Sequence, residues 1–191
     1  MPKTKPAIHI QNIVASAALN QRINLGKVVQ KFPFAEYSPR VFPGLVFRLK
    51  KPKTATLIFE TGKMVCTGAK SEKEAVQAVN KVTKELRSHG IPLPNKPVVN
   101  IQNIVASAEL NGEIDLENVV YKLQKVMYEP EQFPGAVYRM DVPKVVFLIF
   151  SAGKLVCVGA KREGDVYEAV GKLQQILEEK ELIFYPATLE R

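Results

Sequence analysis

The residues best suited to covalent or metal chemistry are few and scattered in this sequence. Cys66 and Cys157 each stand alone, whereas a zinc or iron–sulfur site needs several closely spaced ligands. His9 and His89 belong to no evident Ser/His/Asp or Cys/His arrangement. We therefore predict no metal site, no cofactor and no catalytic centre, and we expect both cysteines to be buried strand residues.

Two glycine–lysine segments invite comparison with a phosphate-binding loop. Gly62-Lys63 and Gly68-Ala69-Lys70 lack the G-x-x-x-x-G-K-[ST] spacing of such a loop. They also fall in a predicted β-hairpin, whereas a phosphate-binding loop precedes a helix. The protein is therefore not expected to be an enzyme.

These segments belong to a duplication that covers most of the chain. Residues 10–70 align with residues 101–161 without a gap, and 34 of the 61 positions are identical. The two cysteines are equivalent in this alignment, whereas the two histidines have no counterparts. The chain therefore carries two copies of one unit, and its ligand is expected to have approximate two-fold symmetry as well.

Each copy contains the same series of elements that must position its side chains. Hydrophobic periodicity and turn residues predict a strand, a short helix, three further β segments and a long helix. The strand is expected at 8–16 and 98–107, the short helix at 25–31 and 116–123, and the long helix at 72–88 and 163–180. Turns are expected at 42–44, at Pro52 and at 61–63.

Alternation along the predicted hairpin separates two faces. One face carries Ile58, Met64, Cys66 and Gly68, which are apolar or small and suit packing beneath helices. The other face carries Leu57, Phe59, Lys63, Val65 and Thr67. We predict an α+β fold in which the helices cover one face of an antiparallel sheet. The opposite, bare face is apolar enough to be a binding surface.

The domain organisation follows from the duplication and from breaks in periodicity. We expect a flexible N-terminus at 1–6, a first repeat at 7–90, a linker at 91–97, a second repeat at 98–181 and a C-terminal tail at 182–191. The tail is either an apolar flap on the second repeat or disordered. No apolar run is long enough to cross a bilayer and no signal pattern is present, so we expect a soluble protein that stays inside the cell, with no membrane partner.

The charge is unevenly divided between the halves. Residues 1–95 carry 16 Lys and Arg against 5 Asp and Glu, whereas residues 96–191 carry 11 against 14. A net charge of +8 indicates a polyanionic partner. The asymmetry indicates that the two halves also have different neighbours.

Four blocks occur in the same order in both repeats, and they resemble the TATA-box-binding protein family over nearly the whole chain. The blocks are Gln-Asn-Ile-Val, Phe-Pro-Gly-x-Val-x-Arg, Pro-Lys-x-x-x-Leu-Ile-Phe and Gly-Lys-x-Val-Cys-x-Gly-Ala-Lys, joined by Tyr128-Glu129-Pro130-Glu131. The resemblance implies two tandem pseudo-symmetric repeats that form one curved antiparallel sheet, a saddle with helices on its convex face. It implies that the concave face binds the minor groove of A/T-rich promoter DNA and bends it.

The resemblance also assigns roles to side chains. Asn12 and Asn103 are implied to donate amide hydrogens to base acceptors near the centre of the site. Thr67 matches a base-contacting threonine, but its equivalent is Val158, so we expect a weaker polar contact on that side. The implied apolar base contacts are Val14, Leu57, Val65, Val105, Leu148 and Val156.

Two further groups follow from the resemblance. Two phenylalanine pairs, Phe42 with Phe59 and Phe133 with Phe150, match residues that wedge between base pairs and kink DNA. The implied phosphate contacts are Arg48, Lys63, Lys70, Arg139, Lys154 and Lys161.

The loop before the second wedge is implied to bind a protein. Glu129, Glu131 and Gln132 match positions that contact transcription factor B, through which RNA polymerase is recruited indirectly. The first repeat is basic and lacks these acidic residues, so a protein partner can distinguish the second repeat from the first. The resemblance thus implies a general transcription factor for initiation.

Two alternatives stay open at this stage: a sheet-based protein-interaction module and an RNA-binding module. Failure to bind any DNA would favour the first, and a preference for single strands would favour the second. Near-identical repeats favour an archaeal source, with the protein in the cytoplasm or nucleoid; a eukaryotic homologue would be nuclear.

Overall fold

The computed structural model describes residues 5–187, which form two compact units. One unit comprises Asn12–Asn103, and the other comprises the described parts of Met1–Gln11 and Ile104–Arg191. The boundary between the units cuts through two long strands, β1 (Ala7–Ala18) and β5 (Val98–Glu109). Each repeat therefore gives the beginning of its first strand to the unit built mainly from the other repeat.

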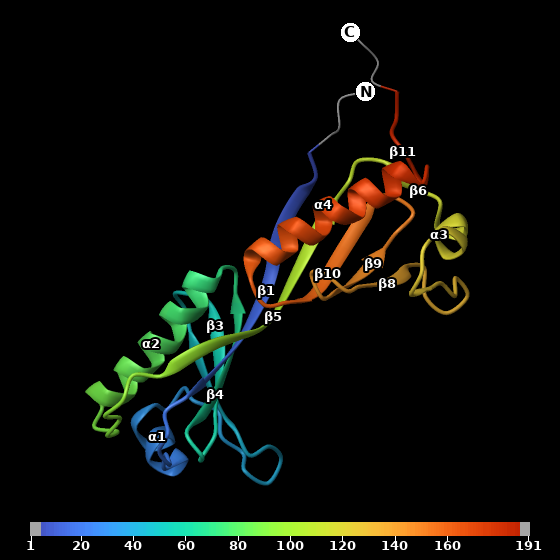
Figure 1. Ribbon diagram of the computed structural model, residues 1–191. Helices are drawn as coiled ribbons and strands as arrows, with labels where there is room; N and C mark the ends of the chain where they lie inside the picture. The colour runs from blue at the N-terminus through green and yellow to red at the C-terminus, as the bar shows by residue number, and fades with distance from the viewer. Residues whose placement is uncertain (1–4, 188–191) are drawn as a thin grey trace. The chain divides into compact units, whose positions relative to one another are not determined.

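The unit of residues 12–103 is a sheet covered by helices on one face (Figure 1). Its hydrogen-bonded strand order is β2-β3-β4-β1-β5, and the neighbours from β2 to β1 are antiparallel. Besides the parts of β1 and β5, the elements are α1 (Leu25–Lys31), β2 (Leu45–Leu49), β3 (Thr54–Ile58), β4 (Lys63–Ala69) and α2 (Glu72–Ser88).

The other unit repeats this plan with three additional short strands. Its main strand order is β1-β5-β10-β9-β8-β7, and β11 pairs with β6 beside it. The elements are β6 (Glu113–Ile114), α3 (Leu116–Lys122), β7 (Val126–Met127), β8 (Ala136–Met140), β9 (Val145–Ile149), β10 (Lys154–Ala160), α4 (Glu163–Glu179) and β11 (Ile183–Phe184). The long helix α4 lies along the strands of this unit (Figure 1).

The core of each unit lies between the long helix and one face of the sheet. Ile58, Met64 and Cys66 are almost completely buried in the unit of α2, together with the helical residues Val79 and Val82. Helical spacing of 3.6 residues and strand alternation of two residues bring these apolar side chains together. Within residues 5–187, no helix packs on the opposite face of the sheet.

A β-bulge at Gly68 corrects the expected alternation. Gly68 was expected on the buried face, but Ala69 is buried there and Gly68 is half-buried. One residue of β1, Val14, opposes two residues of β4, Thr67 and Gly68, at this point, and Gly68 adopts φ = +102°. A Cβ atom at Gly68 would lie 3.1 Å from the carbonyl oxygen of Lys53, so glycine suits both the conformation and the space.

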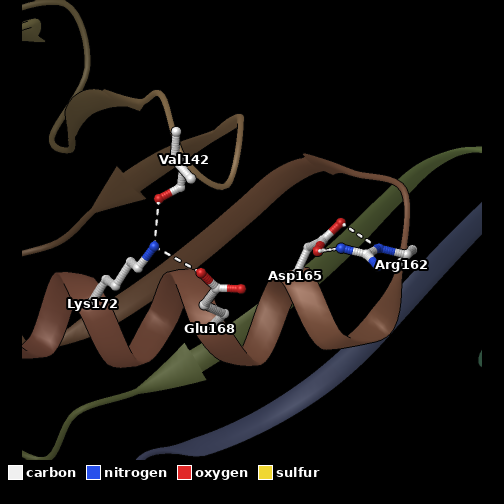
Figure 2. Close-up of polar contacts among 5 residues, drawn as sticks. All are labelled: Val142, Arg162, Asp165, Glu168 and Lys172. Atoms are coloured by element: carbon white, nitrogen blue, oxygen red, sulfur yellow. Dashed lines mark hydrogen bonds and ion pairs between the residues drawn. The ribbon is translucent and has the colours of Figure 1, made fainter.

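A lysine ties each long helix to the hairpin beneath it. Lys172 on α4 donates a hydrogen bond to the Val142 carbonyl oxygen at 2.9 Å and pairs with Glu168 at 2.7 Å (Figure 2). The equivalent Lys81 on α2 donates to the Lys51 carbonyl oxygen at 2.6 Å. Both carbonyls precede a proline of the turn that joins the two strands, so the duplicated contacts hold equivalent turns against equivalent helices.

The helices begin differently in the two repeats. Ser71 caps α2 by accepting the backbone N–H of Glu74 at 3.0 Å. Arg162 at the same position of α4 makes no side-chain cap and instead pairs with Asp165 at 2.7 Å (Figure 2). The negative charges of the first turn favour both helix N-termini through the helix dipole.

The predicted fold class is confirmed: two tandem α+β repeats with antiparallel strands and helices on one face. The short helix 25–31 and the long helix 72–88 have the predicted bounds. The two helices of the second repeat each end one residue earlier than predicted. The short strands β6, β7 and β11 were not predicted. Of the C-terminal tail, Leu182 and Ile183 are buried, which supports the apolar flap for that part; the residues after 187 lie outside the described chain.

Candidate nucleic-acid interface

The bare face of each sheet is lined by apolar residues that are half-buried rather than enclosed. In the unit of residues 12–103, Leu57 on β3 lies directly opposite Val65 on β4, and Val14 lies on β1. All three alternate with residues buried beneath α2. The structure therefore places these sequence-predicted residues together on the helix-free face.

The equivalent face of the other unit has the same character. Leu148 on β9 lies opposite Val156 on β10, and Val158 lies opposite both Val146 and Val105. All of these residues are half-buried. Val146, and its equivalent Ala55 in the first repeat, were missed by sequence reasoning, although alternation along β9 and β3 could have identified them.

The two predicted phenylalanine pairs form in both units. Phe42 and Phe59 meet edge to face with ring centroids 5.9 Å apart, and Phe133 and Phe150 do so at 5.8 Å. Phe42 is 40% exposed and Phe133 is 39% exposed, so large apolar rings remain in contact with solvent. The repeat symmetry argues against ordinary core packing for these rings.

Local backbone structure explains why the rings stand where they do. A Cβ atom on Gly44 would lie 2.6 Å from the Phe42 ring, so glycine leaves the space that this ring occupies. Phe59 directly follows β3 and begins a tight turn in which Gly62 donates its backbone N–H to the Phe59 carbonyl oxygen at 2.9 Å. A Cβ atom on Gly135 would likewise lie 2.8 Å from the Phe133 ring. In each pair, one ring therefore packs closely against a glycine, and the other directly follows a strand.

A polar group interrupts the apolar face in the unit of residues 12–103. Gly68 donates its backbone N–H to Asn12 Oδ1 at 2.7 Å, which fixes the orientation of the amide. Asn12 Nδ2 then donates to Thr67 Oγ1 at 3.1 Å. The amide has a second N–H hydrogen available for a ligand acceptor. Asn103 occupies the equivalent half-buried position on β5.

The predicted phosphate-contacting residues are exposed, and four of them lie at the ends of the strands that carry the apolar residues. Lys63 and Lys154 begin β4 and β10, and Lys70 and Lys161 follow the ends of these strands. Arg48 on β2 forms a long ion pair with Glu36 at 3.6 Å, and Arg139 is its exposed equivalent on β8. The exposed Arg48–Glu36 pair contributes little stability, so the guanidinium can exchange its partner at small cost.

The loop between β7 and β8 presents the predicted acidic residues to solvent. Glu129, Glu131 and Gln132 are all exposed. The Glu129 carbonyl oxygen accepts the backbone N–H groups of Gln132 and Phe133 at 3.0 and 2.9 Å. In the first repeat, the Ser38 carbonyl oxygen makes the equivalent bonds to Val41 and Phe42. The two loops thus share a backbone structure and differ in charge.

The two cysteines are buried in strands, as expected. Burial raises the pKa of Cys157 to about 12 and also raises the pKa of Cys66, so both thiols stay protonated at neutral pH. Among the described residues, no group of His, Cys, Asp and Glu is arranged to hold a metal ion. No helix in the described part of the chain is both long and apolar enough to span a membrane.

Comparisons with known proteins match this architecture to one family. The family described as "Transcription factor TFIID (or TATA-binding protein, TBP)" matches residues 7–89 and 98–180. The TATA-box-binding protein of Pyrobaculum calidifontis is 50% identical over 184 residues, which are 96% of this chain and 92% of that protein. That of Pyrodictium occultum is 53% identical over 173 residues, covering 91% and 87% of the two chains.

A solved structure agrees with the sequence matches. The structure of Methanococcus jannaschii TBP aligns with a TM-score of 0.82 and 47% identity, and the alignment covers 90% of this chain and 98% of that chain. These relatives are archaeal proteins. The chain therefore belongs to the TATA-box-binding protein family, a family of non-enzymatic, DNA-binding transcription factors.

Proposed function

We propose that this protein binds the minor groove of A/T-rich promoter DNA, kinks it with its phenylalanine pairs, and recruits transcription factor B and, through it, RNA polymerase at the archaeal nucleoid. The observation that supports the proposal is that each unit has an apolar, helix-free face, an aromatic pair with one exposed ring, and exposed cations at equivalent positions.

The apolar face selects A/T-rich DNA by exclusion. In the minor groove A·T and T·A pairs present only acceptors, whereas a G·C pair adds the guanine amino donor. Leu57, Val65 and their equivalents offer that donor no acceptor. Burying an unpaired donor costs roughly 1–3 kcal/mol, so G·C pairs facing these residues weaken binding. Asn12 supplies an amide N–H to the acceptors that every base pair presents there.

The aromatic pairs supply the kink. An apolar ring inserted at a base step unstacks it at a cost of about a few kcal/mol, which the larger contact with the opened groove offsets. Phe42 and Phe133 are already exposed, so binding requires no core residue to leave its place. The exposed Arg48, Lys63 and their equivalents neutralise phosphates along the groove.

The loop with Glu129 and Glu131 provides the contact for transcription factor B. Its carboxylates are exposed and attract a basic partner surface. The equivalent positions of the first repeat are Ser38 and Arg40, which lack this charge. The protein partner therefore binds one end of a nearly symmetric protein and gives the complex a direction.

The test is a gel-shift titration combined with a bend measurement. One duplex carries a TATA-like element, and the second has its central A·T pairs replaced by G·C. We expect tight binding to the first duplex alone and a bend that Phe133→Ala reduces. Tyr121→Ala is the matched control, because Tyr121 is an 85% exposed aromatic residue on α3 that belongs to neither phenylalanine pair, and this variant should keep the bend.

The remaining outcomes separate the alternatives. Equal and steeply salt-dependent binding to both duplexes would show that the protein binds DNA only through nonspecific electrostatic contacts. A preference for single-stranded RNA would favour an RNA-binding module. Binding to no nucleic acid would make the apolar face a protein-interaction surface.

A further inference from the structure

We propose that Thr67 makes one half of the interface accept a G·C pair that the other half, with Val158, rejects. This inference rests on the proposed binding of the minor groove and adds a directional rule to it. The positions are equivalent in the two repeats, and both lie on the helix-free faces.

The hydroxyl of Thr67 is held in a defined position by its neighbours. Asn12 Nδ2 donates to Thr67 Oγ1 at 3.1 Å, and Thr67 Oγ1 lies 3.3 Å from Asn12 Oδ1. The Asn12 amide is itself oriented by the backbone N–H of Gly68 at 2.7 Å. The positive φ of the glycine at the bulge allows this short contact. The hydroxyl is therefore pre-positioned rather than freely rotating.

A hydroxyl oxygen can pair with a guanine amino group, whereas a methyl group cannot. The oxygen of Thr67 has two acceptor lone pairs, and the contact with Asn12 Nδ2 uses one of them. The second can accept the N–H of guanine N2, which is the group that otherwise penalises G·C pairs in the minor groove. A G·C pair that faces Thr67 therefore keeps its amino group hydrogen-bonded.

Val158, at the equivalent position of the second repeat, has no hydroxyl oxygen to accept a hydrogen bond. Its register partners on the neighbouring strands are Val146 and Val105, so three valine side chains lie in a row across β9, β10 and β5. A guanine amino group pressed against these methyl groups is buried without a partner. We expect this side to weaken binding to a G·C-containing site by about tenfold relative to the Thr67 side.

The difference between Thr67 and Val158 can be measured as the direction in which the protein binds a DNA site. A palindromic A/T site with one G·C pair placed on one side of its centre can be bound in two directions, and the guanine faces Thr67 in only one of them. A hydroxyl-radical cleavage reagent attached at Ser38→Cys reports the direction, because Ser38 lies in an exposed loop and the native cysteines are buried.

We expect the Ser38→Cys protein that carries the reagent and keeps Thr67 and Val158 to cut one end of this site about tenfold more than the other. The double exchange Thr67→Val with Val158→Thr should move the cut to the opposite end. Thr67→Ser, which retains the hydroxyl, should keep the original preference. Thr67→Val alone should weaken binding to the G·C-containing site more than binding to the all-A/T site.

Two results would overturn the inference. The first is equal cutting of both ends by the Ser38→Cys protein that keeps Thr67 and Val158. The second is a double-exchange variant that still cuts mainly the same end. Failure of the protein to bind the all-A/T site would instead contradict the proposed function. The all-A/T duplex thus separates the two failures.

Discussion

Thr56 and Phe147 occupy equivalent positions of the two repeats but fill the two cores differently. Both are fully buried. Thr56 lies opposite the buried Phe47, whereas Phe147 lies opposite the half-buried Tyr138. The large buried ring is thus on β2 in one unit and on β9 in the other. The exchange leaves Thr56 Oγ1 buried, and in the described structure its polar neighbour is the weakly hydrogen-bonding thiol of Cys66, directly opposite on β4.

We therefore expect Thr56→Val to stabilise the protein by about 1 kcal/mol, because valine keeps the shape and removes a desolvated hydroxyl. Guanidinium denaturation followed by circular dichroism measures the change. Thr54→Val is the matched control, since Thr54 Oγ1 donates to the Pro52 carbonyl oxygen at 3.2 Å and its loss should destabilise. A destabilised Thr56→Val variant would show that the hydroxyl has a partner.

The buried thiols give a prediction about pH. Burial raises the pKa of Cys157 to about 12, so the folded state favours the neutral thiol. This contribution to stability is complete below the ordinary thiol pKa and is lost as the pH rises toward 12. At pH 8 we expect Ellman's reagent to label neither cysteine in the folded protein and both in denaturant. Rapid labelling of the folded protein would contradict the burial.

At the scale of single residues, repetition made the candidate site visible in the sequence. The phenylalanine pairs, the cations and the apolar strand residues recur with the same spacing in both repeats. The structure shows that the phenylalanines pair and that the cations are exposed, while the proposed role of each residue stays a prediction. The contact between Asn12 and Thr67 could not be predicted in the same way. It depends on the bulge at Gly68, which shifts the alternation by one residue.

At the scale of elements, the two long helices differ at their first residue. Ser71→Ala should destabilise the protein by about 1 kcal/mol, because it leaves the backbone N–H of Glu74 without its cap. Arg162→Ala should cost less, since it removes an ion pair that is mostly exposed on the arginine side. Parallel guanidinium titrations compare the two variants, and an equal or larger loss for Arg162→Ala would contradict this ranking.

Element length explains which elements the sequence predicts. The helices α2 and α4 have 17 residues each, long enough for a clear periodic stripe. The strands β6, β7 and β11 have two residues each, too few for any alternation to be visible. Their pairing is determined by neighbours distant in sequence, as where Ile183 meets Ile114.

At the scale of the whole molecule, the proposed phosphate contacts predict how strongly DNA binding depends on salt. Lys63→Ala and Lys154→Ala should each reduce the slope of log K against log salt concentration by roughly 0.9, because each lysine displaces about one counterion from DNA. Fluorescence anisotropy at several salt concentrations gives the slope. Lys84→Ala on α2 is the control and should leave it unchanged, since this exposed lysine lies on the helix side.

The division of β1 and β5 between the compact units has a consequence for how this chain can be cut. A protease that cleaves the segment around residues 91–97 would leave two fragments, each of which still supplies a strand segment to the other's unit, as in a domain-swapped pair. Such a nicked protein should migrate as a single particle in gel filtration and separate only in denaturant. Because each repeat lacks a strand segment of its own unit, we expect neither repeat to fold stably when expressed alone.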